Sequence, residues 1–260
     1  MPIDLAYHSF GSGPPLVILH GLFGCKENWR YLARQLGQQF QVFSIDQRNH
    51  GQSPHCEEFG YQAMADDLLA FLNSHGLDQI QLLGHSMGGK TAMQFAACHP
   101  QRLTRLIVED ISPCAYSPRH EHLFAALGRL PLAQLTSRSE ADRLLQQAVP
   151  EPAVRQFLLK NLQRQPGGGF TWRFNLPVLD RHYPDLITAL NIAAPIEVPT
   201  LFLRGGQSDY LPPDLPSEIT RNFKEVSLET IEGAGHWVHA EQPEAFLQAV
   251  TTFLLPAART

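Results

Sequence analysis

Clusters of positive charge are absent from this sequence, and charged residues of any kind are few. Charged side chains make up 17% of the 260 residues, the formal net charge is -5, and Lys and Arg form no run. Nucleic acids and anionic membranes attract clustered cations, so this composition argues against both as partners. We therefore expect no nucleic-acid partner and no membrane partner.

Cysteine pairs and long apolar runs are also missing. The four cysteines lie in unrelated contexts with no Cys-x-x-Cys motif, which predicts free thiols and not a disulfide framework or a zinc knuckle. No window approaches the roughly 18 apolar residues of a membrane span, and the first residues lack the basic and apolar regions of a signal peptide. The expected location is therefore cytoplasmic.

Metal-binding motifs are lacking as well. The chain has twelve histidines but no His-Glu-x-x-His motif. Small groups such as His120-Glu121-His122, or the pair His236 and His239, are usually surface or packing features in a histidine-rich chain. We expect no metal and no other cofactor.

What the sequence does contain is an alternation of short apolar runs with helical periodicity. Runs such as 16–19, 41–46 and 105–110 suit strands buried on both faces, and the helical segments between them predict parallel crossovers. The fold class is therefore α/β, with a mostly parallel sheet flanked by helices.

The alternation stops after residue 111 and resumes near residue 196. Residues 112–195 show the pattern of several amphipathic helices, and nothing at either end resembles a linker. We expect a single domain over 1–260, with a core of 1–111 and 196–260. The segment 112–195 would be a small helical lid inserted after the sixth strand, above the strand ends where α/β proteins bind ligands.

The most informative stretch is Gly84-His85-Ser86-Met87-Gly88, placed between an apolar strand and a helix. Gly-x-Ser-x-Gly in this context predicts a nucleophile elbow, a tight turn that exposes the serine hydroxyl at the tip of the strand. Glycines are needed two positions before and after Ser86 because a side chain there would clash as strand and helix close together. We predict Ser86 as a nucleophile.

A serine hydroxyl needs a general base, and the base needs an acid to orient it. His236, in Gly-Ala-Gly-His-Trp after the last expected strand, fits the chain order of nucleophile, acid and histidine. Two aspartates are candidates for the acid. Asp110 ends the strand after the elbow helix, and Asp209 follows the next strand. Spacing alone does not choose between them, although a carboxylate buried at the end of a strand needs a partner such as an imidazole.

Hydrolysis of an ester also needs donors for the oxyanion that develops on the acyl group. In this architecture they are the N–H after the nucleophile and an N–H from the loop after an early strand. Met87 supplies the first, and Leu22, in His20-Gly21-Leu22-Phe23-Gly24, is our choice for the second.

Six blocks spread along the chain resemble one family. The blocks are His-Gly-Leu-Phe-Gly, Asp-Gln-Arg-Asn-His-Gly-Gln-Ser, Gly-His-Ser-Met-Gly-Gly-Lys, Asp-Ile-Ser-Pro, Trp-Arg-Phe-Asn and Gly-Ala-Gly-His-Trp-Val-His. With these blocks the chain resembles α/β-hydrolases over its whole length, and more narrowly the YbfF-type bacterial esterases and their mitochondrial abhydrolase relatives. The resemblance implies an α/β-hydrolase fold and a serine esterase or acyl thioesterase under a small helical lid.

The resemblance also bears on the acid. In this branch the aspartate of Asp-Ile-Ser-Pro often serves, and the later aspartate is often missing from Gly-Gly-x-Ser-x-Tyr. Here Asp209 is present, which departs from that pattern. We predict Asp110 and keep Asp209 as the alternative.

The predicted function is cleavage of carboxylic esters or acyl thioesters, acyl-CoA among them, through an acyl-enzyme on Ser86. The same fold serves C–C hydrolases, lyases and acyltransferases, and a non-catalytic ligand receptor is the rival from another class. The partner is then a small-molecule ester or thioester, and the chain is expected as a monomer or a dimer. Apolar residues expected to line the substrate pocket are Phe23, Phe124, Trp172, Phe174 and Trp237.

Overall fold

The sheet at the centre of the protein has seven strands in the order β1-β3-β2-β4-β5-β8-β9. The computed structural model describes residues 1–214 and 216–255. Only β1 runs antiparallel to its neighbour β3, and all other pairs are parallel. The strands are β1 (Tyr7–Phe10), β2 (Pro15–Leu19), β3 (Gln41–Ile45), β4 (Ile80–His85), β5 (Leu103–Glu109), β8 (Thr200–Gly205) and β9 (Val226–Ile231).

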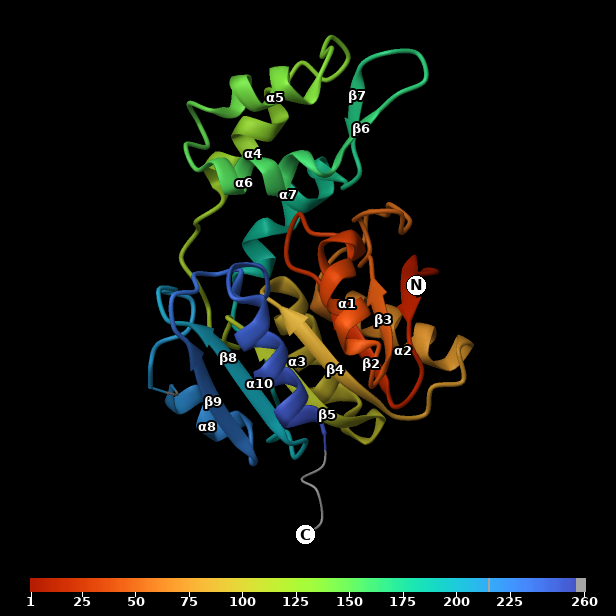
Figure 1. Ribbon diagram of the computed structural model, residues 1–260, viewed down its shortest axis with the longest axis vertical. Helices are drawn as coiled ribbons and strands as arrows, with labels where there is room; N and C mark the ends of the chain where they lie inside the picture. The colour runs from red at the N-terminus through yellow and green to blue at the C-terminus, as the bar shows by residue number, and fades with distance from the viewer. Residues whose placement is uncertain (215, 256–260) are drawn as a thin grey trace.

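Helices cover both faces of this sheet (Figure 1). The parallel strands β2, β4 and β8 are almost fully buried, because apolar side chains project from both faces of the sheet into two separate clusters. The cluster on one face includes residues of α2 (Tyr61–Ser74), α3 (Met87–Cys98) and α8 (Ser217–Asn222). The cluster on the other face includes residues of α1 (Arg30–Leu36) and α10 (Pro243–Leu254).

The chain between β5 and β8 forms a helical layer above the strand ends (Figure 1). Its elements are α4 (Glu121–Gly128), α5 (Arg138–Leu145), α6 (Pro152–Leu159), the hairpin of β6 (Leu162–Arg164) and β7 (Phe170–Trp172), and α7 (Leu176–Leu186). Most residues of a third apolar cluster lie in this segment, and Phe23, Met64 and Met87 join it from below. The layer therefore packs directly on the loops around Ser86.

This inserted segment follows the fifth strand and not the sixth. Before residue 11 the structure has the single strand β1. Residues before Tyr7 contribute no strand, because the Ile3 amide donates to the Asp67 carboxylate and the Ala6 amide donates to the Ser53 hydroxyl. The predicted fold class, an α/β-hydrolase fold, is confirmed.

No helix in the described ranges combines the length and the apolar composition needed to cross a bilayer.

Candidate active site

Ser86 lies in a strained turn between β4 and α3. Its φ is 53° and its ψ is -118°, a region that residues with a side chain rarely adopt. A Cβ on Gly84 would lie 2.2 Å from the Gly88 carbonyl oxygen, and a Cβ on Gly88 would lie 2.4 Å from the Leu19 carbonyl oxygen. The two glycines therefore let strand and helix meet closely enough to hold Ser86 in this conformation.

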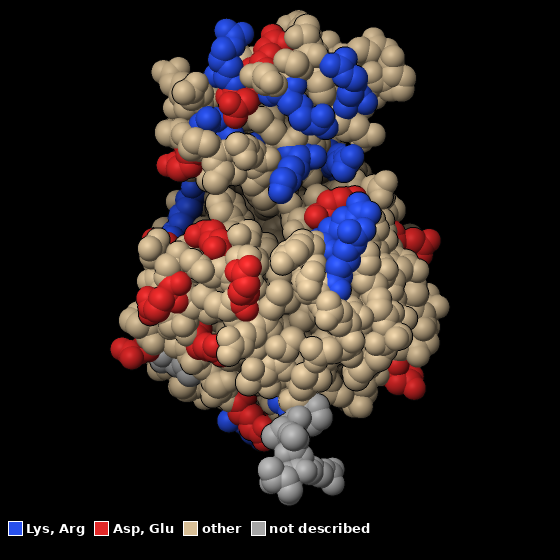
Figure 2. All heavy atoms as spheres, viewed as in Figure 1, with Lys and Arg blue, Asp and Glu red and all other residues tan. Residues whose placement is uncertain are grey.

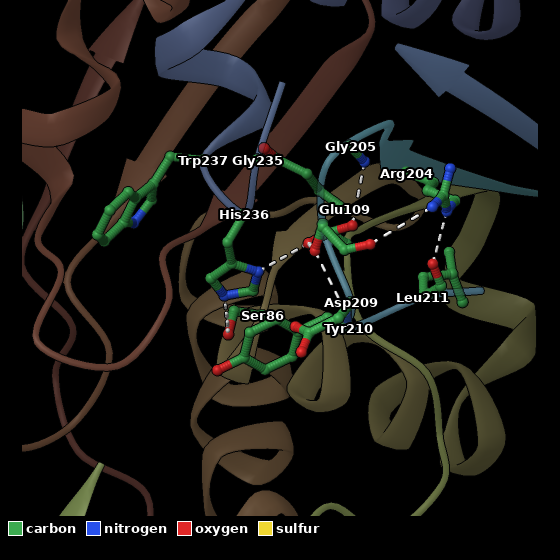
Figure 3. Close-up of polar contacts among 12 residues, drawn as sticks. Ser86, Glu109, Arg204, Gly205, Asp209, Tyr210, Leu211, Gly235, His236 and Trp237 are labelled. Atoms are coloured by element: carbon green, nitrogen blue, oxygen red, sulfur yellow. Dashed lines mark hydrogen bonds and ion pairs between the residues drawn. The ribbon is translucent and has the colours of Figure 1, made fainter. Parts of the chain in front are cut away.

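His236 reaches Ser86 from the loop between β9 and α9 (Val238–Glu241). Its Nε2 lies 3.0 Å from the Ser86 Oγ (Figure 3), and its Nδ1 lies 2.8 Å from the Asp110 Oδ2. These contacts suit an imidazole that donates its Nδ1–H to the carboxylate and accepts the serine proton at Nε2. The structure thus brings the three predicted residues together in the required order.

Asp110 is fully buried, and all of its contacts favour a carboxylate that accepts hydrogen bonds. Its Oδ1 accepts the Gly205 N–H at 3.1 Å, and its Oδ2 accepts both the His236 ring and the Ser208 hydroxyl. The residue has a φ of 48°, so the chain turns sharply at the end of β5 and aims this side chain at the β8 side of the sheet. Sequence reasoning attached no role to Ser208.

Asp209 points elsewhere. Its carboxylate accepts the Arg119 Nη1 at 2.6 Å, and its side chain is 76% exposed. Within the described residues it makes no hydrogen bond to His236. The geometry therefore favours Asp110 over Asp209 as the partner of the imidazole.

Aromatic and histidine side chains fix the position of His236. The Tyr210 ring stacks on its imidazole with centroids 3.9 Å apart and planes 20° apart (Figure 3). On the other side, the His85 Nε2 donates to the His236 carbonyl oxygen at 2.9 Å. Burial lowers the pKa of His85 to about 3, so this ring is neutral and donates from one nitrogen only.

The expected oxyanion donors, Leu22 and Met87, both have free N–H groups. Across residues 1–214 and 216–255, neither amide donates to another protein atom. Met87 is the first residue of α3, where an amide has no carbonyl one turn earlier to bond. Both residues border the same cavity as Ser86, so the two donors face the space where an acyl oxygen would sit.

Two buried histidines hold the Leu22 loop, and sequence reasoning gave neither of them a role. The His20 Nδ1 donates to the Gly21 carbonyl and its Nε2 accepts the Gln47 N–H at 3.0 Å. The His50 Nε2 accepts the Phe23 N–H at 3.3 Å. Burial lowers the pKa of His20 to about 4 and that of His50 to about 3, which keeps both rings neutral as these contacts require.

Two cavities meet at Ser86, beneath the recess between the helical layer and the core (Figure 2). The small cavity, of about 50 Å³, is bordered by Met87, Lys90 and Tyr61 among others. The large cavity, of about 280 Å³, is bordered by His236 and extends under α6. Both are lined mainly by apolar side chains, which suits an ester with organic groups on each side of the scissile bond.

The predicted pocket aromatics divide into two groups. Phe23 and Trp237 line the large cavity. In the described part of the chain, Phe124, Trp172 and Phe174 line neither cavity, which corrects our expectation. They pack instead between the helical layer and the core. The Phe23 ring centroid lies 5.0 Å from that of Phe124 and 5.1 Å from that of Phe174, and the Trp172 ring stacks on Phe174. All three rings are buried in this apolar cluster.

A group of side chains below His236 has the chemistry of metal ligands. Among the described residues, His85, Glu109 and His239 offer ligand atoms within 4.8 Å of one another. The His239 backbone N–H and Nδ1 both lie within 2.9 Å of the Glu109 Oε1, and the His239 ring stacks on Trp29. These bonds use the Glu109 Oε1 and the His239 Nδ1, whereas the Glu109 Oε2 is buried without a hydrogen-bond partner among the described residues.

Comparison with known proteins shows the family of the chain. A family model described as the alpha/beta hydrolase fold matches residues 14–243. The chain belongs to the alpha/beta hydrolase fold family. This α/β-hydrolase is 41% identical to the sn-1-specific diacylglycerol lipase ABHD11 of Mus musculus, over 97% of this chain and 86% of that protein. It is 38% identical to the esterase YbfF of Escherichia coli K12, over 92% of each chain.

A solved structure also has the same fold. A marine microorganism esterase superposes on this α/β-hydrolase with a TM-score of 0.95 at 40% identity, covering 97% of this chain and all of that one. The family predicted from the sequence is therefore confirmed.

Proposed function

We propose that the protein is a serine hydrolase that cleaves carboxylic esters or acyl thioesters through an acyl-enzyme on Ser86. The single observation that carries the proposal is the hydrogen-bonded chain from Ser86 through His236 to Asp110. A partly exposed serine and imidazole followed by a buried carboxylate, beside two free amides, have the arrangement of a nucleophile, a general base and an orienting acid. Relatives named as an esterase and a lipase support the same reaction type.

The proposed reaction has two halves. Ser86 Oγ attacks the acyl carbon while the His236 Nε2 takes its proton, and the Leu22 and Met87 amides stabilise the oxyanion. The imidazolium then protonates the leaving alcohol or thiol, and Asp110 stabilises its charge. In the second half, His236 activates a water that cleaves the acyl-enzyme and releases the acid.

We infer that residues 112–195 act as a lid in this reaction. Arg119, His120, Leu123 and Phe157, all within this segment, line the large cavity next to Ser86. A lid that excludes water strengthens the electrostatic contacts to the oxyanion.

Replacement of the nucleophile tests the proposal. We expect Ser86→Ala to lower kcat for a short p-nitrophenyl ester by a factor on the order of 10⁴ or more, because the triad acts as a unit. The matched control is Ser227→Ala, an exposed serine on β9, which should keep full activity. A fluorophosphonate probe should label the wild type at Ser86. Unchanged turnover in Ser86→Ala, or no labelling of the wild type, would refute the proposal and favour a ligand receptor.

A further inference from the structure

The two cavities share Ser86 but differ in their other walls. His236 borders the large cavity and not the small one, within the part of the chain that the structure describes. The imidazole that protonates the leaving group must reach its oxygen or sulfur atom, so the leaving group occupies the side on which His236 lies. The acyl group therefore extends into the small cavity, toward Met87, Ile111 and Lys90.

Two cations border this acyl site, Lys90 and Arg119, and of the two only Lys90 is buried. It is the fourth residue of α3, and it is only 1% exposed. Its Nζ donates to the Cys114 carbonyl at 2.8 Å and the Thr188 carbonyl at 2.6 Å. An ammonium group has three N–H donors, so one remains for another acceptor. The Tyr61 and Tyr116 rings lie 5.8 and 5.1 Å from the Nζ and form walls of the same cavity.

No acidic side chain neutralises this buried cation. Across the described residues, no Asp or Glu oxygen lies within 4 Å of the Lys90 Nζ, whereas buried Lys26 pairs with Asp46 at 2.6 Å and Arg48 with Asp67 at 2.6 Å. Burial lowers the pKa of Lys90 to about 8, which reflects the cost of its charge.

The position of Lys90 in its helix adds to that cost. It lies in the first turn of α3, where the helix dipole also presents positive charge. Two sources of positive potential therefore converge beside Ser86 without a protein counter-ion, in a place where an anion would be stabilised.

We propose that the small cavity binds a short acyl group that ends in a carboxylate, with the Lys90 ammonium as its counter-ion. The inference rests on the proposed function and adds the substrate class: half-esters or half-thioesters of short dicarboxylic acids. One water-sized sphere needs about 10–15 Å³, so a cavity of about 50 Å³ holds roughly four such groups, enough for one or two methylenes and a carboxylate. Hydrolysis consumes one water and releases the alcohol or thiol and the free dicarboxylic acid.

Kinetics with a matched pair of esters test the inference. Monomethyl succinate and methyl 4-methylpentanoate have the same shape, but only the first ends in a carboxylate. We expect the wild type to prefer monomethyl succinate at least tenfold in kcat/KM, and Lys90→Met to reduce that ratio at least tenfold. The matched control is Arg119→Met, which removes a cation that borders the same cavity but is paired with Asp209. This variant should keep the preference, and loss of the preference there but not in Lys90→Met would overturn the assignment.

Binding of the two esters to Ser86→Ala tests the same inference without the Lys90→Met variant, whose folding could be impaired. Calorimetry with Ser86→Ala should show tighter binding of monomethyl succinate than of methyl 4-methylpentanoate, and equal or reversed affinities would overturn the inference. The two levels of the proposal fail differently. If the wild type hydrolyses the neutral ester equally well, the acyl class is wrong and the hydrolase stands. If it hydrolyses neither ester and the fluorophosphonate probe does not react, the proposed function itself fails.

Discussion

At the scale of single residues, the two aspartates differ in what surrounds them. Asp110 is fully buried and accepts hydrogen bonds from Gly205, Ser208 and His236, whereas the Asp209 side chain is 76% exposed and pairs with Arg119. A buried carboxylate is held in one geometry and stabilises the imidazolium directly. An exposed ion pair contributes little to either.

We therefore expect the two asparagine variants to behave differently. Asp110→Asn should lower kcat/KM by a factor on the order of 10³ to 10⁴, since the amide favours the wrong imidazole tautomer. Asp209→Asn is the matched control and should stay within about threefold of the wild type, because only an exposed ion pair is lost. Steady-state kinetics with a p-nitrophenyl ester measures both, and a large loss in Asp209→Asn alone would reverse our choice of acid.

The sequence predicted that Ser86, His236 and Asp110 lie together, because chain order and the ends of strands set their positions. It missed Ser208, because the contact with Asp110 requires β5 and β8 to pair in register, with Glu109 opposite Leu203. It also misplaced Phe124, Trp172 and Phe174, since an aromatic pattern does not tell whether rings face a cavity or each other.

At the scale of elements, regular periodicity predicted most of the core and part of the inserted segment. Apolar residues recur at helical spacing in Tyr61–Ser74 and in Pro243–Leu254, and both segments are helices in the structure. The hairpin of β6 and β7 was missed because strands of three residues carry no period. The helix α7 was missed because Pro177 and Pro184 both lie within it, and proline normally interrupts a helical pattern.

In the turn from β4 to α3, the backbone leaves no space for a side chain on Gly84 or Gly88. We expect Gly84→Ala to cost several kcal/mol of stability, or to abolish esterase activity, because the new methyl would lie 2.2 Å from the Gly88 carbonyl oxygen. Gly128→Ala is the matched control: this exposed glycine ends α4 and has no atom within 4 Å of the added methyl. That variant should be neutral or gain up to about 1 kcal/mol from higher helix propensity. Urea unfolding measures both, and equal stabilities would contradict the steric argument.

At the scale of the whole molecule, four histidines are buried beneath the site: His20, His50, His85 and His239. Burial lowers the pKa of His20 to about 4, and the pKa values of His50, His85 and His239 to about 3. Burial has the opposite effect on Glu109 and raises its pKa to about 7. The four rings contact the Leu22 loop, the His236 loop or residues that support them, so their protonation state is linked to both stability and the geometry of the site.

Acid should therefore destabilise the protein well above the pH at which ordinary carboxylates titrate. Between pH 6.5 and about 4 the unfolded chain binds protons at these histidines and the folded chain does not, so the free energy of unfolding falls as the pH falls. His20 and His50 should each contribute about 2 kcal/mol of this loss at pH 5. Glu109 acts against them below pH 7, because there the folded state holds its proton more tightly. Four histidines outweigh one carboxyl group, so urea unfolding should give a lower stability at pH 5 than at pH 7.5.

The source of that loss can be located with one pair of variants. His50→Gln removes a group that the unfolded chain protonates, so the difference in stability between pH 7.5 and pH 5 should shrink by about 2 kcal/mol, even if the variant is less stable at both values. His122→Gln, at an exposed position on α4, should leave the difference as it is in the wild type. If the wild type is equally stable at both pH values, the buried rings are already charged in the folded state. The neutral tautomers that hold the Leu22 loop would then be wrong, because a protonated His50 cannot accept the Phe23 N–H.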